Sequence, residues 1–131
     1  MEHLEELTVW LKSFPRWGEA DLTVDSTGSK PGACGLFPVG IEVLESREDV
    51  LGNRKTRLRQ SFLLRRNAVR GTDAAAWLLG FARWAEQSAA AAPVFGSRQT
   101  LRAEKGRLSN AAQTGTGFYE IKLTFEYVIE E

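Results

Sequence analysis

The chain has few of the side chains that catalytic and metal sites use most often, because its 131 residues include one cysteine, Cys34, and one histidine, His3. A lone cysteine forms no disulfide within the chain, which fits a reducing compartment. One cysteine and one histidine cannot supply the usual four ligands of a structural zinc site. His3 lies near a chain end that is expected to fray, which disfavours a Cys–His or Ser–His–Asp mechanism. We therefore expect no catalytic residues, no cofactor and no metal.

Long hydrophobic runs and nucleotide-binding motifs are also missing. No apolar stretch approaches the roughly 18 residues that cross a membrane. The acidic start, MEHLEEL, is unlike a signal peptide. We therefore expect a soluble protein made in a cytoplasm, with no membrane partner. Residues 28–32, GSKPG, lack the spacing of a phosphate-binding loop. The balance of 17 basic and 17 acidic residues argues against a dedicated nucleic-acid binder.

The zero net charge hides an uneven distribution along the chain. Residues 1–25 carry a net charge of −4, residues 47–70 carry +6 and residues 117–131 carry −3. Two interpretations stay open. The unlike patches of different subunits could meet in a self-assembled ring, or the oppositely charged strands could pair within one subunit.

The clearest structural pattern lies at residues 118–131, FYEIKLTFEYVIEE. Apolar and polar residues alternate from residue 119 to residue 130, and only Val128 breaks the alternation. Because side chains alternate between the two faces of a strand, this pattern predicts a long strand with one buried and one solvated face. Such strands are typical of an antiparallel sheet.

Helical spacing of apolar residues predicts two helices, one at residues 4–14 that ends at Pro15 and one at residues 73–87. Alanines 89–92 could extend the second helix as far as Pro93. The four tryptophans are interpreted as core between the helices and the sheet.

Further strands are predicted at residues 22–25, 34–39, 41–46, 55–67 and 100–108. Pro38 and Gly40 indicate an edge or a bulge, and residues 47–54 are expected to form a hairpin loop. The chain is therefore expected to form a single α+β domain over residues 1–131. We expect an antiparallel or mixed β-sheet of four to five strands with two helices packed on one face.

Several stretches, in order along nearly the whole chain, resemble the minor capsid and tail-terminator-like proteins of tailed phages and prophages. The similarity is carried by LTVWLKSFP followed by WG, by DSTGSKPG, by RQSFLLRR, by WLLGFARWAEQ and by GFYEIKLTFEY, at residues 7–18, 25–32, 59–66, 77–87 and 117–127.

The resemblance implies a non-enzymatic, tail-terminator-like virion protein that forms a hexameric ring on the head-proximal end of the tail tube. Its partners would be further copies of itself, the tail tube and sheath proteins, and the head–tail connector, with DNA passing through the lumen. It would be assembled in the bacterial host cytoplasm and reside in the tail or neck of the virion. The alternative is a small protein-binding adaptor from a mobile element, with no virion role.

In such a ring we expect charged residues to form the subunit interface. The expected interface residues are Arg54, Lys55, Arg57 and Arg59 on a basic arm, and Glu120, Glu126 and Glu130 on the acidic last strand. Whether the basic strand faces DNA or an acidic neighbour stays open at this point.

Overall fold

A computed structural model describes residues 4–18, 21–28, 30–69, 74–108 and 117–130 of the chain. His3 lies outside these residues. The elements are α1 (Leu4–Lys12), β1 (Leu22–Val24), β2 (Cys34–Glu48), β3 (Arg54–Asn67), α2 (Ala74–Gln87), the 3-10 turn η1 (Ala89–Ala91), β4 (Ser97–Leu108) and β5 (Phe118–Glu130).

The five strands form one mixed sheet in the order β1-β2-β3-β5-β4. Only the short β1 runs parallel to its neighbour, β2, and the other pairings are antiparallel. The predicted α+β class, with two helices on one face of the sheet, is confirmed. Apart from β2, the predicted strand positions are also confirmed, although β4 begins at Ser97 rather than at residue 100. The predicted hairpin loop at residues 47–54 is shorter, because β2 continues to Glu48 and β3 begins at Arg54. The alanine run forms the single turn η1 instead of a longer α2.

The longest strand, β2, is continuous where two segments were predicted. Its pairing with β3 shifts register between Pro38 and Gly40, and again between Val43 and Glu45, which leaves Val39 and Leu44 as extra residues. Bulges of this kind bend a strand and increase its twist without ending it. The prediction of a bulge near Pro38 is therefore confirmed, whereas the prediction of a break in the strand is wrong.

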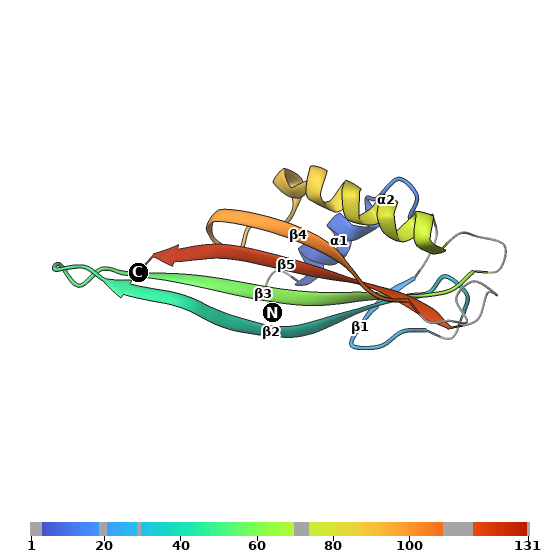
Figure 1. Ribbon diagram of the computed structural model, residues 1–131, viewed down its shortest axis with the longest axis horizontal. Coiled ribbons are helices and arrows are strands. Elements are labelled where there is room, and N and C mark those ends of the chain that lie inside the picture. Colours follow the sequence, from blue (N-terminus) through green and yellow to red (C-terminus); the bar gives the residue numbers. More distant parts are fainter. Residues whose placement is uncertain (1–3, 19–20, 29, 70–73, 109–116, 131) are drawn as a thin grey trace.

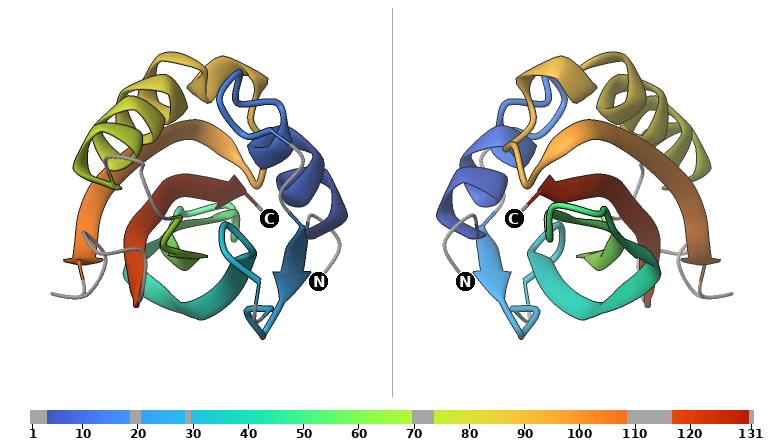
Figure 2. Two further views of the ribbon diagram at one scale, coloured as in Figure 1. Left: turned by 90° about the vertical axis from the view of Figure 1, so that its right-hand side faces the viewer. Right: turned by 90° about the vertical axis from the view of Figure 1, so that its left-hand side faces the viewer.

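Both helices lie above the sheet, which curls beneath them when viewed along its long axis (Figure 2). The core-facing residues of the sheet, such as Phe62 and Phe125, are fully buried. The helical layer is held by packed aromatic rings: Phe81 contacts Phe14 at 5.1 Å and Trp77 at 5.2 Å between ring centroids. Trp10 and Trp17 are buried, and Trp77 and Trp84 are half-buried against the core cluster. The interpretation of the tryptophans as core is confirmed.

The helices are much shorter than the strands that they cover. At about 3.3 Å per residue, the 15 residues of β2 span roughly 50 Å. At about 1.5 Å per residue, the 14 residues of α2 span roughly 21 Å. Figure 1 accordingly shows one end of the long strands without a helix above it. We call this end of the β2–β3 hairpin, residues 39–58, the arm.

The aromatic cluster generates a stability prediction. Phe81 is fully buried between Phe14, Trp77 and Trp84. We therefore expect Phe81→Ala to lower the free energy of unfolding by about 3–5 kcal/mol, measured by urea denaturation. Leu79→Ala on the same helix is the matched control, because Leu79 is 59% exposed, and it should change stability little. Equal losses in the two variants would show that the cluster does not anchor α2.

Candidate assembly surface

The basic residues predicted for an interface pair with acids of the same chain. Arg59 donates to Glu126 at 2.8 Å and contacts Glu42 at 3.6 Å, while Arg57 reaches the other oxygen of Glu126 at 3.3 Å. Glu126 faces both arginines because β3 and β5 place Arg59 opposite Glu126 in register. Two hydrogen-bonded guanidinium groups, that of Arg59 first, hold the pKa of Glu126 below its usual value.

The remaining predicted residues are also occupied within the chain. Lys55 lies 3.9 Å from Glu130, and Arg54 lies 3.8 Å from Glu48. Glu120 is separate from the arm and pairs with Arg65 at 3.2 Å, with its own side chain only 5% exposed. Of the two interpretations of the charge pattern, pairing within one subunit is what the structure shows. The charged residues expected at the interface are therefore already paired within the chain, and Glu120 is also buried.

An apolar stripe on the arm continues the core face of the sheet beyond the helices. Ile41 and Val43 pair with Gln60 and Leu58 of β3, which belong to the same face as the buried Phe62. Yet Ile41 is 57% exposed and Val43 is 62% exposed. Figure 1 shows no helix above the end of β2 that leads to the hairpin loop. We define the arm stripe as Ile41, Val43 and Leu58 of the arm together with Ile129 of β5, which pairs with Thr56 of the arm. An exposed apolar surface that continues a core is the usual mark of a binding surface.

The outer edges of the sheet are poorly suited to pairing with another strand. β1 pairs only with residues 34–36 of β2, and the rest of that edge carries Pro38 and the two bulges, which disrupt a regular ladder. At the opposite edge, the backbone N–H of Ala103 in β4 donates to the Glu86 carboxylate of α2 at 3.3 Å. The arm stripe is therefore a stronger candidate for contact than either edge.

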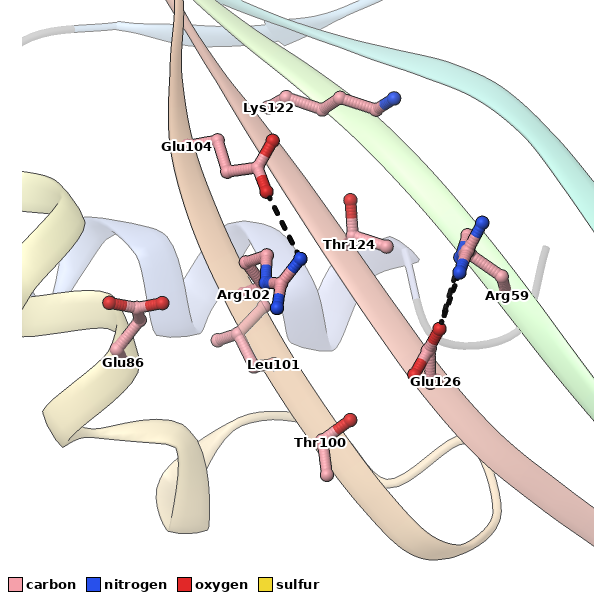
Figure 3. Close-up of a pocket in the computed structure, with 9 residues that line it drawn as sticks. All are labelled: Arg59, Glu86, Thr100, Leu101, Arg102, Glu104, Lys122, Thr124 and Glu126. Carbon is pink, nitrogen blue, oxygen red and sulfur yellow. Dashed lines mark hydrogen bonds and ion pairs between the residues drawn. The ribbon is translucent and has the colours of Figure 1, made fainter.

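A polar depression lies along β3, β4 and β5 (Figure 3). Its volume of about 610 Å³ falls within the range of small-molecule pockets. However, its lining is ionic rather than apolar, and much of it is already paired. Arg59 binds Glu126 and Arg102 approaches Glu104 at 3.5 Å, while Lys122 and Thr124 lie between these pairs. The depression therefore lacks the apolar walls with a few convergent polar groups that define such a pocket.

Elsewhere, the described residues offer few features suited to a reactive, metal-binding or membrane-spanning role. Cys34 is buried, and this burial raises the pKa of its thiol to about 12, so the reactive thiolate is scarce at neutral pH. Within the described ranges, no group of three or more His, Cys, Asp and Glu residues is arranged to hold a metal ion. Likewise, none of the described helices has both the length and the apolar character that crossing a bilayer requires.

Sequence reasoning placed the interface on charged residues and missed the arm stripe. The sequence does contain a signal for this surface. Residues 39–44, VGIEVL, continue the apolar pattern of β2 beyond the length of strand that two short helices can cover. Comparison of the chain with protein-family models and with curated proteins found no match.

The ion pairs of Glu126 generate a pH prediction. Because its pKa is lowered in the folded chain, ionised Glu126 stabilises the fold above its unfolded pKa, and this contribution disappears as the pH falls through the folded pKa. Glu126→Gln should therefore lower the melting temperature modestly at pH 7, and the difference from wild type should close on acidification. Glu104→Gln, at an exposed pair, is the control with a smaller expected effect. A difference that persists in acid would contradict this assignment.

Proposed function

We propose that this chain is a structural virion assembly protein of a tailed phage or prophage, which caps the head-proximal end of the tail tube as a ring and joins it to the head connector. The observation that carries the proposal is the arm stripe: an apolar continuation of the core that the chain itself leaves uncovered. The sequence resemblance supplies the identity of the assembly.

In a ring of identical subunits, the arm stripe of one copy can contact the next copy, so no second kind of protein is needed to cover it. Identical subunits related by rotation present one surface to the next copy, and the contact repeats until the ring closes. The stripe lies on a three-stranded part of the sheet, where β3 is bonded on one side to β2 and on the other to β5. It is therefore held in a rigid geometry before association, which limits the entropy lost on binding.

Function can be tested in a phage or prophage that encodes the chain. Deletion of the gene should yield overlong or unterminated tails without heads in electron micrographs of lysates. Tails of normal length that fail to join filled heads would instead assign the head-joining role alone. Normal infectious particles would overturn the virion proposal and favour a protein-binding adaptor.

The surface itself is tested by complementation. A double variant, Ile41→Glu with Val43→Glu, should remain folded, because both side chains are largely exposed, but should fail to restore infectious particles. Val9→Glu is the matched control, since Val9 is an exposed valine on α1 away from the arm. Full complementation by the folded double variant would exclude the arm stripe from assembly.

A further inference from the structure

The tip of the arm presents two apolar side chains from an ordered loop. Val50 and Leu51 are almost wholly exposed there. One Asp49 carboxylate oxygen accepts hydrogen bonds from the backbone N–H groups of Leu51 and Asn53, both at 2.9 Å, and the other accepts from the Asn53 side chain at 3.2 Å. Gly52 takes the positive φ of 85° that closes the turn. An exposed leucine on a fixed backbone is suited to fill a cavity on a partner.

A matching groove lies elsewhere on the chain, between η1 and the start of β4. Its walls are mostly small or apolar residues, together with the polar Gln99 and Thr100; the others are Ala89, Ala90, Ala92, Val94, Gly96 and Leu101. The volume of about 260 Å³ is below the range of roughly 300–1,000 Å³ typical of small-molecule pockets. Small side chains line an open hollow of the size that one or two aliphatic side chains would fill.

The charges beside the tip and the groove are opposite. The hydrogen bonds from Asn53 lower the pKa of the Asp49 carboxyl group below its usual value. Arg98 lies in the sequence between the groove residues Gly96 and Gln99 and is exposed, and none of the ion pairs among the described residues involves it. A basic residue next to the groove in the chain and an acidic residue at the tip favour a single orientation of contact.

The tip and the groove of one chain are far apart: the tip forms the extreme end of the molecule, whereas residues 89–96 lie near its middle, above the sheet (Figure 1). We propose that Val50 and Leu51 of one subunit insert into the groove between η1 and β4 of a second copy of the chain, with Asp49 beside Arg98. This inference rests on the proposed ring and adds a contact at the tip of the arm to the one that the arm stripe makes. Because the two surfaces differ, the contact is head-to-tail, which is the type that closes rings.

Two complementary variants test this contact in solution. Leu51→Asp damages the tip and leaves the groove, and Val94→Asp damages the groove and leaves the tip; both side chains are exposed, so both variants should fold. Each alone should self-associate at least about tenfold more weakly than wild type in sedimentation experiments, because a charge enters an apolar contact. Val9→Asp should associate as wild type does.

Mixing the two variants distinguishes a head-to-tail contact from other arrangements. The intact tip of Val94→Asp can enter the intact groove of Leu51→Asp, while the reverse contact is doubly damaged. We therefore expect a 1:1 heterodimer that does not grow further. Wild-type rings without any heterodimer in the mixture would overturn the contact and leave the ring function standing.

The remaining outcomes separate the contact from the biological role. A heterodimer combined with normal particles in the gene deletion would support the contact and reject the virion proposal. Wild-type protein that stays monomeric at all concentrations, with no heterodimer in the mixture, would overturn the contact. Undiminished association of Leu51→Asp would assign the tip to another partner and overturn it as well.

Discussion

The mismatch in length between strands and helices governs this structure. Strands β2, β3 and β5 contain 15, 14 and 13 residues, whereas α1 and α2 contain 9 and 14. Because a helix advances less than half as far per residue as a strand, two such helices cover only part of the sheet. The uncovered part keeps the apolar face that strand alternation gives it. The arm stripe is thus a direct result of element lengths rather than of any special motif.

Much of the fold could be predicted from local sequence rules. Alternation in residues 118–131 and helical spacing in residues 73–87 gave the correct element types, because each element has one buried and one solvated face. The single continuous β2 was missed, because Pro38 and Gly40 suggest a break when they are read in isolation. In the sheet, β3 pairs with β2 on both sides of the bulge and bridges the irregularity.

The candidate surface was less predictable than the fold. The sequence shows which strands carry opposite charges but not the register in which these strands pair. That register decides whether the charges meet within a chain or between chains. The 13 paired positions of β3 and β5 bring Arg59 opposite Glu126, which partners these charges internally. Exposure of Ile41 and Val43 depends on where the helices end in space, which no local pattern reports. The Asp49 turn and the alanine-lined groove likewise arise only from the three-dimensional arrangement.

The place of β5 between β3 and β4 has a consequence for how the chain reaches its native state. β5 comes after both of its partner strands in the sequence. Until β5 has been synthesised, β4 therefore has no neighbouring strand and one edge of β3 is unpaired. The β2–β3 hairpin closes locally, but the sheet is completed through contacts such as Arg57 to Glu126, which are 69 residues apart. Non-local pairing of this kind is slow. Nascent chains would therefore expose both the edge of β3 and the part of the stripe on β2 and β3, and this is the stage at which they are most prone to aggregate.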